Sequence, residues 1–236
     1  VVNIECRENF LSMMIHADSK NDASRKFYTW VSHLKEMWIR RLELAEGDPT
    51  REELISQFRK NYKEAIRRVS NKHSFENIID LMPDTIRDTH IALVIQNSNE
   101  INWSNATSHI LIGAEMLNRG FTIENLSVTY MPRYSRGKST ADTIQQRCRF
   151  FGYKQKYLDI CRVFLPYESA EEYKDYVEHE EIMRTWLLEN KSLEEVAQVL
   201  ILDERMNATR KNILSVNVVQ SKLNGWRQVN LSLIHI

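Results

Sequence analysis

Arginine, glutamine and glycine are concentrated between residues 109 and 162, and these residue types commonly contact phosphate groups. An apolar run ends at Gly113, and an Arg119–Gly120 turn followed by Thr122 comes a few residues later. Glycine lets the backbone approach a ligand closely, and an arginine beside it can donate two hydrogen bonds to one phosphate. Arg-Gly turns are also common without a ligand, so this pair alone is a weak signal.

Further phosphate-binding side chains follow in the same stretch. Arg133 comes after Pro132, at the end of an apolar run. If residues from 139 or 142 onward form a helix, Gln145 and Arg149 lie four residues apart on one face. An arginine so placed can stabilise charge on a phosphoryl group in transfer, as an arginine finger does. A solvated basic helix is the alternative, but three arginines at one sheet edge are more informative than any one of them.

Two more residues are candidates for ligand contact, each with a structural alternative. His16 ends an apolar run, and a histidine in that place is more often structural than a ligand contact. Tyr153 belongs to an aromatic stretch interleaved with Arg and Lys, a composition that can stack on nucleic-acid bases. Core packing of Phe150 or Phe151 is the more frequent explanation of such a stretch.

Five short apolar runs predict the strands that must position these residues. They are rich in β-branched and aliphatic residues, and helical patterns separate several of them. The predicted strands cover residues 12–17, 90–95, 109–112, 126–130 and 160–165. This alternation is typical of an α/β domain with a mostly parallel sheet. Open sheets of that kind bind ligands at the carboxyl ends of their strands.

Helical patterns fill the interval between the first two strands, and more follow the last one. Apolar residues recur at three- and four-residue spacing over residues 22–45, and two further helices are expected before residue 88. Their boundary signals are a Gly47–Asp48–Pro49 break, a Thr50–Glu53 capping box, a start near Ser74 and a stop before Pro83. In the tail, Ser169 with Glu172 and Ser192 with Glu195 are expected to cap two more helices.

The helix expected after Thr50 is locally basic. It carries Lys60, Lys63, Arg67 and Arg68 within one short stretch. A solvated helix face is the usual explanation of such charge, and a surface that follows a phosphate backbone is the alternative.

The composition gives no overall electrostatic argument for nucleic acid. Lys+Arg and Asp+Glu both number 32 in the 236 residues, so the net charge is zero and any such argument must rest on local clusters. The cysteines, Cys6, Cys148 and Cys161, have no CxxC spacing, which favours reduced thiols and a cytoplasmic protein. No apolar run is long enough to span a membrane. The chain opens on Val1, and we expect an internal fragment.

Two kinds of catalytic motif are missing from the sequence. There is no GxxxxGK[ST] phosphate-binding loop and no recognisable acidic strand for Mg²⁺, so this chain alone is not expected to hydrolyse ATP. The sequence Glu172-Tyr173-Lys174 is of the ExK form found in some nucleases, but it falls on a predicted helix, where surface charge explains it better.

The block from Ile110 to Arg162 resembles the Z-one domain, a family of candidate endonuclease domains associated with superfamily 2 helicases. The resemblance covers roughly residues 8–166 and is most specific in the second half. The matching residues are Gly113, Leu117, Arg119, Gly120, Thr122, Glu124, Tyr130, Arg133, Asp142, Thr143, Gln146, Arg149, Phe151, Gly152, Tyr153, Tyr157, Asp159 and Arg162, with His16 in register upstream. Cys148, where the family often has Gly, and Gly152, where helicases have a second arginine, depart from the pattern.

The resemblance implies the second RecA-like lobe of a helicase. The Arg119–Gly120 segment is similar to helicase motif V, and the Gln/Arg segment to motif VI. In such enzymes these motifs touch the nucleic-acid backbone and the ATP γ-phosphate. Arg149 is then the arginine-finger candidate, with Gln146 as its catalytic neighbour. The implied nucleic-acid or phosphate contacts are Gly113, Arg119, Gly120, Thr122, Arg133 and Gln145.

The sequence therefore predicts a RecA-like α/β domain over residues 1–166, with a helical insertion at about 20–88 and a helical tail at 167–236 packed on it. The expected function is part of an ATP-dependent DNA-processing enzyme in restriction, defence or repair. ATP and Mg²⁺ would bind only together with an N-terminal ATPase lobe of the same protein, and DNA would be the partner. The alternatives are a non-catalytic nucleic-acid-binding or scaffold module and, less favoured, a nuclease.

Overall fold

The computed structural model describes most of the first three quarters of the chain. The described residues are 10–17, 21–69, 72–95, 101–118, 122–132, 144 and 154–189. The chain divides into two compact units, one comprising residues 1–133 and 149–165, the other comprising residues 134–148 and 166–236.

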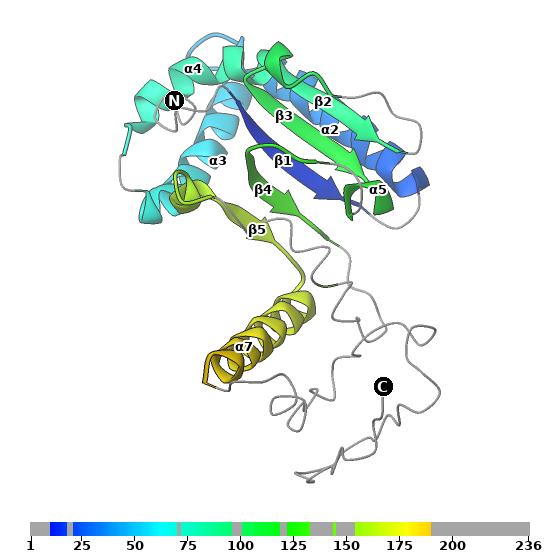
Figure 1. Cartoon of the computed structure of the whole chain (residues 1–236). Coiled ribbons are helices and arrows are strands. Elements are labelled where there is room, and N and C mark those ends of the chain that lie inside the picture. The colour runs from blue at the N-terminus through cyan, green and yellow to red at the C-terminus, as the bar shows by residue number, and fades with distance from the viewer. Residues whose placement is uncertain are drawn as a thin grey trace. The chain divides into compact units, whose positions relative to one another are not determined.

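A five-stranded sheet forms the centre of the first unit (Figure 1). Its strands are β1 (Leu11–His16), β2 (Thr89–Val94), β3 (Ser108–Gly113), β4 (Leu126–Tyr130) and β5 (Arg162–Phe164). Every neighbouring pair is parallel, in the order β2-β3-β1-β4-β5. The predicted α/β fold with a parallel sheet is confirmed. The last strand is shorter than predicted, because residues 158–160 form a 3-10 turn, η3 (Leu158–Ile160).

Helices occupy the interval between β1 and β2. They are α2 (Asn21–Leu42), α3 (Pro49–Ala65), the 3-10 turn η1 (Ile66–Arg68) and α4 (Phe75–Asp88). α2 contacts β2 and β3, while α3 and α4 pack against α2. The rings of Trp38 on α2 and Phe58 on α3 meet edge to face at 5.2 Å, and Leu54 on α3 is fully buried. Burial of these apolar side chains holds the helical layer together.

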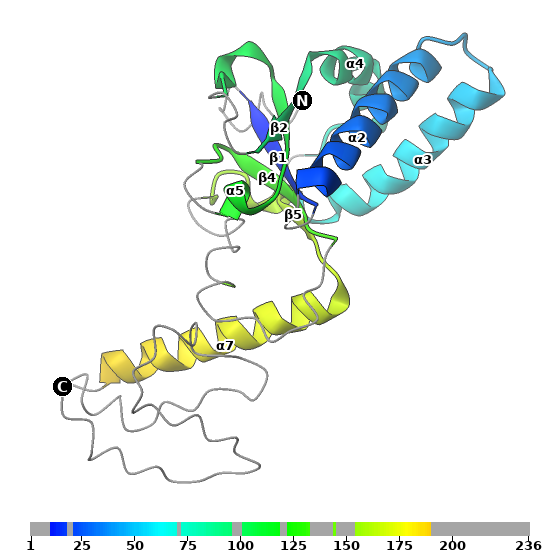
Figure 2. The ribbon, with the colours of Figure 1, turned by 90° about the vertical axis from the view of Figure 1, so that its right-hand side faces the viewer.

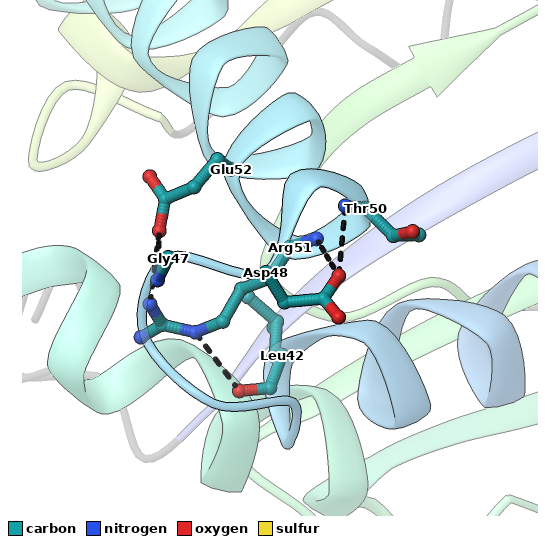
Figure 3. Close-up of polar contacts among 6 residues, drawn as sticks. All are labelled: Leu42, Gly47, Asp48, Thr50, Arg51 and Glu52. Carbon is teal, nitrogen blue, oxygen red and sulfur yellow. Dashed lines mark hydrogen bonds and ion pairs between the residues drawn. The ribbon is translucent and has the colours of Figure 1, made fainter.

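The turn between α2 and α3 is fixed by polar contacts (Figure 3). Gly47 has a φ angle of 85°, a conformation that glycine adopts without strain. Asp48 is the N-cap of α3, since its Oδ1 accepts hydrogen bonds from the backbone N–H groups of Thr50 (2.8 Å) and Arg51 (3.4 Å). The predicted Thr50–Glu53 capping box is therefore wrong. Asp48 takes that role because Pro49 follows it at the first helical position.

Two other helix boundaries differ from the prediction. Ser74 does cap α4, accepting a hydrogen bond from the Asn77 N–H at 3.2 Å, but the helix continues through Pro83. Lys35 of α2 donates to the carbonyl of Arg87 at 2.9 Å and so stabilises the turns beyond the proline. In the second unit, α7 (Tyr167–Glu189) begins before Ser169, so that serine lies inside the first turn and is not the N-cap.

Different elements cover the two faces of the sheet (Figure 2). α2 lies on one face, where the rings of Phe27 and Tyr130 are 6.4 Å apart. α5 (Glu115–Asn118) lies on the other face, with Leu117 fully buried. Between them, the side chains of Leu111 and Ile112 of β3 have no exposed surface. β3 and β1 are thus the buried centre of the first unit.

The described part of the second unit is mainly α7. Tyr173 and Tyr176 are buried in it, and Tyr176 donates to Glu180 Oε1 at 2.8 Å. The predicted helix opening at Ser192 lies outside the described residues. None of the described helices combines the length and apolar character needed to cross a membrane.

Candidate functional site

The connections that leave the carboxyl ends of the neighbouring strands β1 and β3 run in opposite directions along the sheet. From β1 the chain runs through α2 on one face towards β2, whereas from β3 it runs through α5 on the other face and passes β1 to reach β4 (Figure 1). Neighbouring strands whose connections leave on opposite faces create a crevice outside their carboxyl ends, and open α/β sheets bind ligands there. This carboxyl edge is the candidate site.

Gly113 ends β3 at this edge and lies in register with His16 of β1. A Cβ atom added to Gly113 would lie 2.6 Å from the carbonyl oxygen of Val94 and 2.8 Å from Leu117 Cγ. Its φ angle is not in the left-handed region. Glycine is therefore required here for close packing of α5 and β2 against β3, whatever further contact it makes with a ligand.

His16 and Thr129 are the buried polar side chains of the carboxyl edge. They are 3% and 1% exposed, and both face the same side of the sheet as Gly113, as the strand register shows. Thr129 Oγ1 has no hydrogen-bond partner within the described part of the chain. The sequence reasoning missed Thr129. The sequence feature that could have indicated Thr129 was a hydroxyl residue at a buried position of the strand Leu126–Tyr130.

The described residues include three of the predicted contacts. Gly113 and His16 lie side by side at the carboxyl edge, and Thr122 is exposed in the segment that leads to β4. The remaining predicted residues, Arg119, Gly120, Arg133, Gln145, Gln146, Arg149 and Tyr153, lie outside the described residues. Their roles stay predictions.

A second polar cluster, which the sequence reasoning also missed, lies at the amino end of the sheet. His90 of β2 and His109 of β3 are in register, with their rings 5.6 Å apart. His109 Nε2 is 3.1 Å from the Trp103 carbonyl and 3.2 Å from that of Ala106, so Nε2 carries the proton and donates. Phe10 and Trp103 stack at 5.3 Å beside it. Both strands begin with a hydroxyl residue, a histidine and an isoleucine, and this repeat could have indicated the pair from the sequence.

Charged groups beside this cluster hold α4 and β3 in place. Lys35 Nζ donates to the carbonyls of Arg87 and Thr89, and burial lowers the pKa of Lys35, with Asp88 opposing. The Asp88 carboxylate accepts hydrogen bonds from the Thr107 hydroxyl (2.5 Å) and N–H (2.7 Å), which lower the pKa of Asp88. Burial, then the charges of His109 and Lys35, lower the pKa of His90.

At the start of β4, Lys154 is a buried lysine with a structural partner. Its Nζ donates to the carbonyl of Leu126, and burial lowers the pKa of Lys154. Burial raises the pKa of the nearby Cys161 thiol, which donates to the Tyr157 carbonyl at 3.4 Å. A raised pKa favours the protonated thiol, which is the less nucleophilic form.

Neither a metal-binding cluster nor an ExK nuclease arrangement is found among the described residues. No three His, Cys, Asp or Glu side chains in that part of the chain are placed to hold a metal ion. In the sequence Glu172-Tyr173-Lys174, the Lys174 side chain is exposed on α7 and its Nζ lies 4.0 Å from Glu178 Oε1. The tyrosine between Glu172 and Lys174 is buried. This matches the prediction that Lys174 is surface charge.

Comparison with known proteins identifies a family. No curated protein and no solved structure matches the chain. A protein-family profile described as "Z1 domain" matches residues 2–207, which is most of the chain and extends beyond the 8–166 of the sequence resemblance. The profile spans the whole parallel sheet together with α7. The chain therefore belongs to the Z1 domain family.

Proposed function

We propose that the chain is the carboxyl-terminal, RecA-like lobe of an ATP-dependent DNA-processing enzyme. In this proposal its arginines and backbone N–H groups contact the nucleic-acid backbone and the ATP γ-phosphate. The N-terminal lobe of the same protein supplies the phosphate-binding loop and the Mg²⁺ ligands, which the present sequence lacks. Restriction, defence and repair are the processes in which such an enzyme would act.

The carboxyl edge of the sheet is the observation that carries the proposal. The strands β1, β3 and β4 end there, and Gly113, His16 and Thr129 are small or polar residues near these ends. In sequence, Arg133 comes three residues after the end of β4, and Arg119 follows directly on α5. Short connections from the carboxyl ends of parallel strands favour an arginine-lined site at this edge.

The proposed roles follow from the chemistry of each side chain. Arg149 stabilises the charge that develops on the γ-phosphoryl group, and Gln146 assists beside it. Arg119 and Arg133 donate paired hydrogen bonds to phosphate oxygens, because the guanidinium fork matches the geometry of two such oxygens. Thr122, which is exposed, adds a hydroxyl contact to the nucleic-acid backbone.

ATP hydrolysis by the full-length protein tests this function. It is measured with and without duplex DNA for the wild type, for Arg149→Ala and for Arg147→Ala as a control of equal charge change. We expect DNA to stimulate hydrolysis. We expect Arg149→Ala to lower kcat about 1,000-fold with ATP binding intact, the order of magnitude for loss of an arginine finger. Arg147→Ala should keep most of the activity, since residues two apart would face different sides of the helix that the sequence predicts here.

Two outcomes would contradict the motor-lobe function. Equal losses in both variants would mean that general positive charge is needed, not a finger at Arg149. Complete absence of turnover in the wild-type full-length protein would favour the alternative, a non-catalytic nucleic-acid-binding module that uses the same arginines as a binding surface.

A further inference from the structure

The end of α3 carries a stripe of exposed basic side chains. Lys60, Lys63 and Arg67 are spaced three and four residues apart, so they lie on one face of the helix and its continuation in η1. All three are exposed, and Arg68 adds another exposed charge beside them. We call these three residues the α3 basic stripe.

The stripe differs from the other basic side chains of the same helix. Arg51 Nη1 pairs with Glu52 at 3.4 Å, and Arg59 pairs with Glu76 at 2.9 Å while lying 4.2 Å over the ring of Phe75. Within the described part of the chain, the side chains of Lys60, Lys63 and Arg67 form neither an ion pair nor a hydrogen bond. The positive charge of α3 is therefore neutralised along its earlier turns and left open at its end.

The arrangement is unfavourable for the isolated helix. Lys63 and Arg67 are four residues apart, a spacing at which like charges repel. Glu64 lies four residues after Lys60 and three before Arg67, but it forms no ion pair with either within the described part of the chain. One cation in the last turn is enough to interact with the helix dipole. A cluster of three is better explained by an anion with several charges.

The stripe is held in a fixed place. Arg162, at the start of β5, donates to the carbonyl of Ala65 at the end of α3. The Tyr62 hydroxyl donates to the His73 carbonyl at 2.5 Å and joins the same turn to the segment before α4. Since Arg162 opens β5, the stripe lies towards the amino end of the sheet, away from the carboxyl edge.

We infer that the α3 basic stripe binds the phosphate backbone of duplex DNA, as a surface separate from the carboxyl edge. From residue 60 to residue 67 a helix rises about 10 Å, a length that holds about four consecutive phosphates of one DNA strand, which are about 3.4 Å apart along the axis. Three cations along this length can face consecutive phosphates of that strand. Such contacts position the duplex without reading its sequence. The inference rests on the proposed function for its choice of DNA as the polyanion.

Binding of a fluorescein-labelled 20-base-pair duplex to the 236-residue chain tests the inference by fluorescence anisotropy across a KCl series. The stripe variant is Lys60→Ala/Lys63→Ala/Arg67→Ala. The control, Arg25→Ala/Lys26→Ala/Arg40→Ala, removes the same charge from exposed positions on α2. Each phosphate contact contributes about 0.9 to the slope of log Kd against log [KCl]. Loss of three contacts should therefore lower this slope by about 2.7 in the stripe variant. Its Kd at 100 mM KCl should rise at least tenfold, while the control changes little.

Each other outcome overturns the inference. Equal losses in the two variants would mean that binding follows net charge and not this surface. Wild-type binding that the stripe variant keeps would place the contact elsewhere. Binding of poly-glutamate with no binding of the duplex would identify an acidic protein as the partner. If the duplex does not bind at all, the stripe is not a DNA surface, whereas turnover that depends on Arg149 would still support the proposed function. Thermal unfolding by circular dichroism checks that both variants fold.

Discussion

The two ends of the parallel sheet differ in how their polar groups are used. At the amino end, Lys35, Asp88, His109 and Lys154 all bond to backbone or side-chain groups of this chain. The Nδ1 atoms of His90 and His109 are buried without a hydrogen-bond partner in the described residues. At the carboxyl end, a buried hydroxyl on Thr129 is left without a partner in the described residues. Polar groups bonded within the chain stabilise the fold, and the unbonded hydroxyl of Thr129 lies near the edge where open α/β sheets bind ligands.

The largest expected effect is at the carboxyl end, from Gly113→Ala. The new methyl group would lie 2.6 Å from the Val94 carbonyl oxygen and 2.8 Å from Cγ of the buried Leu117, so both the backbone and the packing of α5 would have to shift. We expect a loss of about 3 kcal/mol in the free energy of unfolding, at the upper end for overpacked cores, measured by urea denaturation.

Gly47→Ala is the matched control for this substitution. Gly47 has a positive φ but nothing within 4 Å of an added Cβ. It should lose only about 1 to 2 kcal/mol, from backbone strain alone. If Gly113→Ala unfolds no more easily than Gly47→Ala, close packing is not what requires a glycine at the end of β3.

A smaller effect is expected at the amino end, from His109→Ala. This change removes the donor to the Trp103 and Ala106 carbonyls and the ring that packs on Phe10 and Trp103. We expect a loss of about 2 kcal/mol in the free energy of unfolding. His33→Ala, at an exposed position of α2, is the control and should change it little. Similar values for both would show that the histidine cluster does not stabilise the sheet.

The smallest effect is a pH dependence that isolates His90. Its folded-state pKa lies below the unfolded value of about 6.5, because the ring is partly buried beside His109 and Lys35. As pH falls below 7, the unfolded chain takes up a proton that the folded chain does not, so the free energy of unfolding decreases until the folded ring is protonated. His90→Gln should therefore show a shallower decrease between pH 7 and pH 5 in parallel urea titrations. An unchanged decrease would assign the titration to another group.

The sequence predicted the strands well because each is a short apolar run. The helix ends were harder, since competing signals lie side by side. Asp48 and Thr50 are both good N-caps, and the position of Pro49 decided between them. Pro83 is a stop signal in sequence, but a lysine from α2 bonds to the end of α4 and the helix continues past it. A neighbouring residue decided the first of these boundaries, and a residue distant in sequence decided the second.

The candidate site divides in the same way. The residue types of the Arg119, Arg133 and Arg149 segments indicated phosphate chemistry from sequence alone, and the family match covers these segments within residues 2–207. Thr129 was not found, because a threonine in a strand is ordinary until the register shows which face it occupies. The His90–His109 pair required the pairing of β2 with β3.

The sequence by itself determined the α/β class and the family, because these depend on local periodicity and residue type, and it predicts phosphate chemistry for the arginine-rich segment. Only the tertiary structure decided the strand order, and with it the edge at which His16, Gly113 and Thr129 meet. It also decided that Gly113 is needed for packing, and that the three side chains of the α3 basic stripe form no ion pair within the described part of the chain. Contacts between residues distant in sequence depend on how the elements pack, and no local pattern records them.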